Sequence, residues 1–70
     1  MVVKDGIVML TPNEQALWEA MLGRELNSHI ELETLRTMGE MRVRELKETG
    51  RIQFAQSAEK HVIALPRQLH

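Results

Sequence analysis

A chain of 70 residues with a net charge of −1 and no cysteine excludes several classes of protein. Without cysteine there is no disulfide framework, no thiolate zinc site and no thiol nucleophile. A domain this short removes only about 60% of its unfolded surface from water, so most of its apolar residues are needed for the core. The fractions of hydrophobic (43%) and charged (27%) residues are ordinary for a folded protein. We therefore expect one globular domain over residues 1–70, with its core within about 7–66.

Neither a membrane span nor a secretory signal is expected. The longest apolar runs cover residues 7–10 and 62–65, whereas a membrane helix needs about 20 apolar residues. Lys4 and Asp5 interrupt the N-terminal apolar residues where a signal peptide would continue. The sequence thus predicts a soluble, cytoplasmic protein with no membrane contact.

The N-terminal residues have the pattern of a small strand unit. Apolar residues 2–3 and 7–10 flank Lys4-Asp5-Gly6, and aspartate followed by glycine is typical of tight turns. We expect a strand or a small hairpin here, joined to the sheet of the domain.

The first helix is expected to begin after Thr11. This residue supplies a capping hydroxyl, the next is proline, and Glu14 is placed to bond back to the cap. Gly23 is a natural end. The helical spacing predicts one apolar stripe, with Trp18 as the core anchor, made of Leu17, Trp18, Met21 and Leu22.

The next segment contains a capping-box pattern at Ser28-His29-Ile30-Glu31, followed by apolar residues at helical spacing as far as Gly50. Gly39 permits two interpretations. It either separates helices at 28–38 and 40–49, or lies inside one helix of about twenty residues, where glycine costs about 1 kcal/mol relative to alanine. The periodicity fits both, and we favour the break.

After Gly50 the apolar period changes from 3.6 residues to 2. Polar and apolar residues alternate over 51–55, and residues 61–65 are rich in β-branched side chains. Residues 56–60 are polar enough for a hairpin loop. The pattern predicts a C-terminal hairpin that packs through Ile52, Phe54 and alternate residues of 62–65 on Leu17, Trp18, Leu35 and Leu46.

Two stretches resemble a known family. Residues 43–54 contain Val43 and Leu46 three residues apart, then a charged stretch, Gly50 and the apolar Ile52. This order resembles the junction at which a recognition helix leads into a wing strand. Residues 5–17 place a short strand before Leu-Thr-Pro-x-Glu. Both resemble winged helix-turn-helix DNA-binding domains, and the second is similar to the output domain of two-component response regulators. The resemblance implies an α+β fold of three helices, an N-terminal strand and a C-terminal hairpin wing.

That resemblance implies a transcriptional regulator that places residues 40–49 against double-stranded DNA, with Arg42 and Arg44 in contact with the groove or phosphates. Because a net charge of −1 works against autonomous binding, we expect a homodimer or a protein partner to supply further affinity. In an alternative interpretation, Arg44 pairs with Glu40 and Glu48 on a solvated helix face. The expected DNA-contacting residues are Arg36, Arg42, Arg44, Lys47, Arg51 and Lys60.

A second candidate function is a protein-protein interaction module on the same scaffold, which would modulate another regulatory or DNA-processing protein. Its candidate interface consists of Met38, Met41 and Glu45, since methionine side chains adapt to varied partners. The two methionines would otherwise fill gaps between helices.

No catalytic or metal-binding pattern is present. His29, His61 and His70 lack the paired spacing of metal ligands, and Ser28 beside His29 does not make a catalytic pair, because adjacent residues on a helix face apart. The four glycines are isolated and form no phosphate loop. We therefore expect no enzyme activity, no metal and no cofactor.

Overall fold

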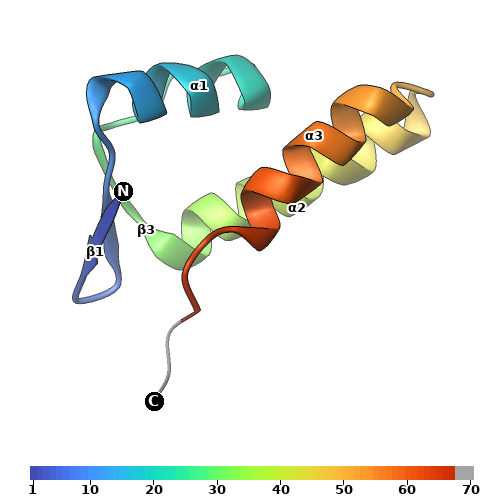
Figure 1. Ribbon diagram of the computed structural model, residues 1–70. Coiled ribbons are helices and arrows are strands. Elements are labelled where there is room, and N and C mark those ends of the chain that lie inside the picture. Colours follow the sequence, from blue (N-terminus) through green and yellow to red (C-terminus); the bar gives the residue numbers. More distant parts are fainter. Residues whose placement is uncertain (68–70) are drawn as a thin grey trace.

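The computed structural model describes residues 1–67, so His70 lies outside the described part of the chain. Within that part a three-stranded antiparallel sheet adjoins three helices. Figure 1 shows the sheet at one end of two long helices that lie side by side, with a shorter helix apart from them. In chain order the elements are β1 (Val2–Lys4), β2 (Ile7–Met9), α1 (Pro12–Leu22), β3 (His29–Glu31), α2 (Leu32–Glu48) and α3 (Ile52–Ile63).

The N-terminal hairpin is confirmed. Asp5 and Gly6 both have positive φ angles, 54° and 76°, and Lys4 pairs directly with Ile7. A two-residue turn of this conformation matches the right-handed twist of the strands that it joins. The local sequence alone therefore accounts for the pairing of β1 with β2.

The capping box expected at residues 28–31 is wrong, because this segment is the third strand. Ile30 pairs with Val8 of the hairpin, and the carbonyl of Ser28 accepts a hydrogen bond of 2.8 Å from the backbone N–H of Leu10. The extended backbone therefore satisfies its hydrogen bonds across the sheet. Helix α2 begins only at Leu32, without a side-chain cap.

Helix α1 begins and ends as expected. Both hydrogen bonds of the capping box between Thr11 and Glu14 are present, and Gly23 ends the helix with φ 70°. Trp18 is confirmed as a core residue, with only 3% of its surface exposed. Leu17, in contrast, is 47% exposed. Its assignment to the core is wrong, because the side of α1 that packs inward is narrower than the apolar stripe.

The carboxylate of Glu14 is a source of pH-dependent stability. The N-terminal ammonium of Met1, 2.7 Å away, and then the backbone N–H of Thr11, hold the pKa of Glu14 below its ordinary value of 4.5. A carboxylate whose pKa is lowered on folding stabilises the folded state above its unfolded pKa, and this contribution is lost as pH falls through the folded pKa. We expect Glu14→Gln to lower the unfolding midpoint at pH 7 and to have progressively less effect at acidic pH.

Thermal unfolding of both proteins from pH 7 to pH 2 measures this difference. Glu25→Gln, a change at an exposed position beyond α1, is the matched control and should leave the midpoint nearly unchanged. If Glu14→Gln lowered the unfolding midpoint by the same amount at every pH, Glu14 would not be the source of this pH dependence.

Helix α2 is continuous through Gly39, so the favoured break is wrong and the one-helix alternative is confirmed. Gly39 is buried against its neighbours: an added Cβ would lie 2.5 Å from Cγ2 of Val62 and 3.5 Å from Cζ3 of Trp18. The absence of a side chain lets α3 and α1 approach α2 closely. Packing from both sides compensates for the low helix propensity of glycine.

The C-terminal hairpin wing is wrong, because residues 52–63 form helix α3. Four small or aliphatic residues at spacings of three and four face the core: Ala55, Ala58, Val62 and Leu65. The alternation over 51–55 was too short to distinguish a strand from a helix. Phe54, which was expected to pack inward, is 69% exposed.

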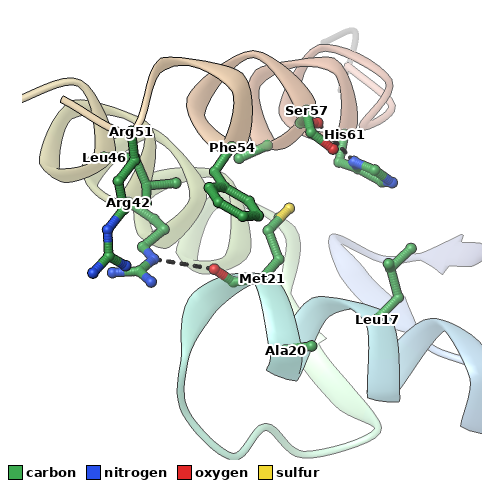
Figure 2. Close-up of a pocket in the computed structure, with 10 residues that line it drawn as sticks. Leu17, Ala20, Met21, Arg42, Leu46, Arg51, Phe54, Ser57 and His61 are labelled. Carbon is green, nitrogen blue, oxygen red and sulfur yellow. Dashed lines mark hydrogen bonds between the residues drawn. The ribbon is translucent and has the colours of Figure 1, made fainter. Parts of the chain in front are cut away.

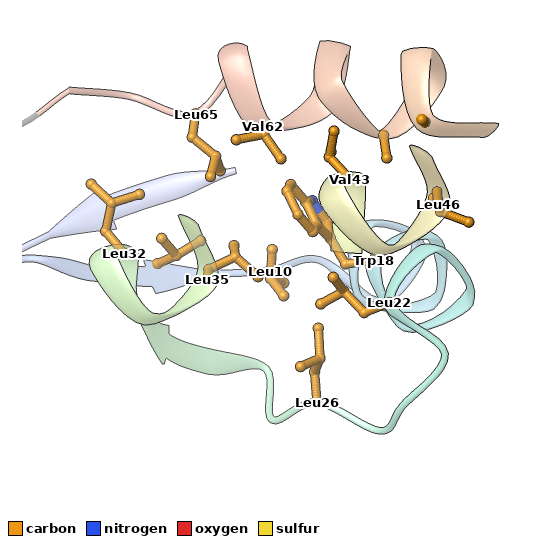
Figure 3. Close-up of a cluster of buried hydrophobic side chains, with 13 residues drawn as sticks. Leu10, Trp18, Leu22, Leu26, Leu32, Leu35, Val43, Leu46, Val62 and Leu65 are labelled. Atoms are coloured by element: carbon orange, nitrogen blue, oxygen red, sulfur yellow. The ribbon is translucent and has the colours of Figure 1, made fainter. Parts of the chain in front are cut away.

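The hydrophobic core lies where α1, α2, α3 and the sheet meet (Figure 3). Leu35 and Leu46 are buried in it, as expected. The coarse prediction of a small α+β fold with three helices is therefore confirmed. No helix within residues 1–67 is long and apolar enough to cross a membrane. The core consists of Val8, Leu10, Trp18, Leu22, Leu26, Leu32, Leu35, Val43, Leu46, Ala55, Ala58, Val62 and Leu65.

Candidate functional site

A groove of about 350 Å³ lies between α1 and α3, above the C-terminal half of α2 (Figure 2). Most of its lining is apolar, with arginine side chains at one end and a histidine farther along. The lining residues are Leu17, Ala20, Met21, Arg42, Leu46, Arg51, Phe54, Ser57, Ala58 and His61. We call this set the α1–α3 groove.

Helix geometry explains why both walls are partly apolar. On α1, Leu17 and Met21 are one turn apart and lie beside the face that carries Trp18 into the core. On α3, Phe54 and His61 lie beside the face of Ala55, Ala58 and Val62. Each wall is thus the flank of a helix whose adjacent face is buried, and the groove is open to solvent above the core.

Phe54 is the most conspicuous residue of the groove. It is the only phenylalanine of the chain, and 69% of its surface is exposed although the domain has few apolar residues to spare. Figure 2 shows its ring over the groove, beside the thioether of Met21 and across from Leu17. A partner side chain between Leu17 and Phe54 would contact apolar groups on both sides.

Arg42 is held in place at the rim. Its Nε donates a hydrogen bond of 3.1 Å to the carbonyl of Met21, and its Nη1 donates one of 2.8 Å to Oε1 of Glu45. The first bond ties α2 to the end of α1 and fixes the orientation of the guanidinium. Arg51, immediately before α3, lines the same end of the groove, and both guanidinium groups extend there in Figure 2.

His61 is also oriented by the fold. Its Nδ1 donates a hydrogen bond of 2.8 Å to the carbonyl of Ser57, one turn earlier. Its ring stands nearly perpendicular to that of Trp18, with 6.3 Å between the ring centroids. Because Nδ1 is used within the helix, Nε2 is the ring atom available to a partner.

The structure does not gather the six basic residues expected at DNA onto one surface. Arg42 and Arg51 share the α1–α3 groove. Arg44 is exposed elsewhere: at 100° per residue it lies about 160° from Arg42 around the axis of α2, between Glu40 and Glu48. Lys60 is exposed on α3 and does not line the groove.

The remaining two basic residues contact the protein itself. Arg36 donates a hydrogen bond of 2.6 Å to the carbonyl of Pro66 and lies 3.6 Å from the carboxylate of Glu33. Lys47 bonds the carboxylate of Glu59 across the pair of α2 and α3, with 3.1 Å between nitrogen and oxygen. Both therefore help to hold the C-terminal part of the chain on α2.

The three residues expected at a protein interface have different environments. Met38 is half-buried and packs against the core, so it fills a gap between elements. Met41 is 64% exposed. Glu45 is exposed and pairs with Arg42. Only Glu45 is connected to the groove, through that pair.

Sequence reasoning named two groove residues, Arg42 and Arg51, and missed the apolar walls. Leu17 was assigned to the core as part of the apolar stripe of the first helix, and Phe54 as an inward residue of the expected C-terminal hairpin. On a helical projection at 100° per residue Phe54 lies only about 40° from Ala58, so even a helical interpretation of residues 52–63 puts it at the edge of the buried face. Within residues 1–67, no three histidine, aspartate or glutamate side chains come together as metal ligands.

Comparisons of the chain with models of protein families, with curated proteins and with solved structures gave no match.

Proposed function

We propose that this chain is a protein-protein interaction module that binds an apolar segment of another protein in the α1–α3 groove. The observation that carries the proposal is the exposed Phe54, which faces Leu17 across an apolar groove. This is the second of the two functions that the sequence suggests, and it rests on the groove rather than on the methionines.

The energetics of apolar surface favour a covered groove. An aromatic side chain buries about 150–250 Å² on full burial, and each Å² of apolar surface removed from water contributes about 25 cal/mol. Covering Phe54 and its neighbours therefore favours association, against the loss of rotational, translational and side-chain freedom on binding. In protein interfaces a few anchor residues, aromatic and arginine side chains among them, carry most of the affinity.

The basic residues give less support to DNA binding. Arg36 and Lys47 are each within 4 Å of a carboxylate, and Arg44 lies between two glutamates one turn away. A DNA-facing helix needs cations free to neutralise phosphates. DNA binding through residues 40–49 stays a prediction, and titration with random duplex DNA at low salt measures it.

Replacing Phe54 with serine tests the proposal. Peptides are first selected on the immobilised intact protein from a random display library, and their affinities are then measured for the parent and the variant. We expect Phe54→Ser to weaken the selected peptides by a factor of about 30, which corresponds to loss of about 2 kcal/mol from an interface anchor. Since Phe54 is mostly exposed, the unfolding midpoint should change little.

Ile63→Ser is the matched control. Ile63 is on the same helix and is 71% exposed, but does not line the groove. This variant should bind the selected peptides as the parent does. Two results would refute protein binding in the groove. The selected peptides could bind Phe54→Ser and Ile63→Ser equally, or the selection could yield no binding peptide.

A further inference from the structure

We infer that the segment bound in the α1–α3 groove is an acidic, amphipathic helix. An apolar side chain of this helix lies between Leu17 and Phe54, and its carboxylates pair with Arg51 and Arg42. The inference rests on the proposed function and specifies the chemistry of the partner.

The charge of the groove differs from that of the whole chain. The chain has a net charge of −1, but within the described residues the groove is lined by two arginines and a histidine and by no carboxylate. Arg51 makes no ion pair within residues 1–67. Its planar guanidinium can therefore bind a carboxylate through two parallel hydrogen bonds.

Arg42 adds a second, more rigid cation at the same end. Its Nε and Nη1 are bonded to Met21 and Glu45, while Nη2 has no hydrogen-bond partner among the described residues. Because the carbonyl of Met21 fixes the guanidinium, less side-chain entropy is lost when a partner binds. The single Glu45 carboxylate does not cancel both arginines.

The secondary structure of the lining favours a helical partner. Every lining residue belongs to α1, α2 or α3, except Arg51, which is the N-cap of α3. The groove thus offers no free strand edge to which an extended peptide can add. A helix satisfies its own backbone hydrogen bonds and presents apolar anchors at spacings of three and four residues.

A second copy of the chain fits the groove less well. Twofold groove-to-groove pairing would place the arginine end of one groove against the end of the other that is lined by His61. No carboxylate lines the groove, so a second copy offers Arg42 and Arg51 no opposite charge from this face. An acidic partner supplies that charge.

The test uses two synthetic helical peptides of about 18 residues, long enough to form a helix in water. Both have leucine at the same i, i+3, i+4 and i+7 positions, and they differ only in glutamate or lysine at the flanking polar positions. Affinities for the intact protein are measured by calorimetry at low and high salt. We expect the glutamate peptide to bind at least about ten times more tightly at low salt, and the preference to shrink at high salt.

Arg51→Glu should reverse the preference, with at least about a tenfold loss for the glutamate peptide. The fold should tolerate the change, because Arg51 is exposed and an acidic residue near the start of α3 interacts favourably with the helix dipole. Arg51→Gln provides a second variant without a new charge. Arg44→Glu is the matched control: it changes the net charge equally, away from the groove, and should leave the preference intact.

Three outcomes would overturn the inference. If both peptides bind equally and Arg51→Glu changes neither affinity, the partner is not acidic, although groove binding through Phe54 would still stand. If neither peptide binds, the acidic helix is excluded, and the separately selected peptides decide the proposed function. If sedimentation shows a dimer that Phe54→Ser dissociates, the occupant is a second copy.

Discussion

Replacing Trp18 with alanine is expected to leave the protein largely unfolded. The indole is 3% exposed and extends from α1 toward the other two helices. Its Cζ3 lies 3.5 Å from where a Cβ on Gly39 of α2 would stand, and its ring is nearly perpendicular to that of His61 on α3. Removing a buried tryptophan costs about 3–5 kcal/mol. A single core of this size rarely provides more than about 3–5 kcal/mol of stability, so the loss is comparable with the whole.

Urea denaturation followed by far-ultraviolet circular dichroism measures the effect without relying on tryptophan fluorescence. Leu17→Ala is the control on the same helix, because Leu17 is nearly half exposed and should change the free energy of unfolding by much less. A Trp18→Ala protein with a cooperative transition near that of the parent would show that the indole does not hold α1 on the other two helices.

Replacing Gly39 with valine is expected to destabilise the protein by about 3 kcal/mol, the upper part of the range for overpacked cores. The first added atom would already lie 2.5 Å from Cγ2 of Val62, and neither valine can avoid the other easily, since β-branched side chains are stiff. The axes of α2 and α3 would have to move apart. Chemical denaturation of the variant and the parent gives the difference in unfolding free energy.

Thr37→Val, at an exposed position of the same helix, is the matched control for the helix propensity of valine and should cost only a few tenths of a kcal/mol. Combining Gly39→Val with Val62→Ala should cost less than the sum of the two single changes, since space lost at one position is recovered at the other. Strict additivity would mean that the two residues do not determine the separation of the helices.

The parts of the fold that were predictable from sequence are those determined by neighbours in the chain. The turn at Asp5 and Gly6 and the cap at Thr11 each need only two to four consecutive residues, and both are present. The break at Gly39 and the C-terminal hairpin failed for the opposite reason. Gly39 packs against Val62, 23 positions away, and no local pattern contains that contact.

The candidate site was predictable only in its charged part. Arg42 and Arg51 were named for their charge and do line the groove. Leu17 was assigned to the core from the apolar stripe of a helix, and Phe54 from the alternation of an expected strand. Even in the helical state Phe54 lies at the edge of the buried face of α3, about 40° from Ala58, so its exposure depends on how α3 packs on the other elements.

The short connection between α2 and α3 has a consequence for how fast the chain folds. The two helices are joined across residues 49–51, where Gly50 has a φ of 77°, and the closing of such a small loop loses little chain entropy. Contacts between residues that are close in sequence form rapidly. The pairing of β2 with β3 is slower, because α1 and the loop after it separate the two strands along the chain. The helical hairpin, like the two-stranded hairpin of β1 and β2, is thus able to form before the third strand is added.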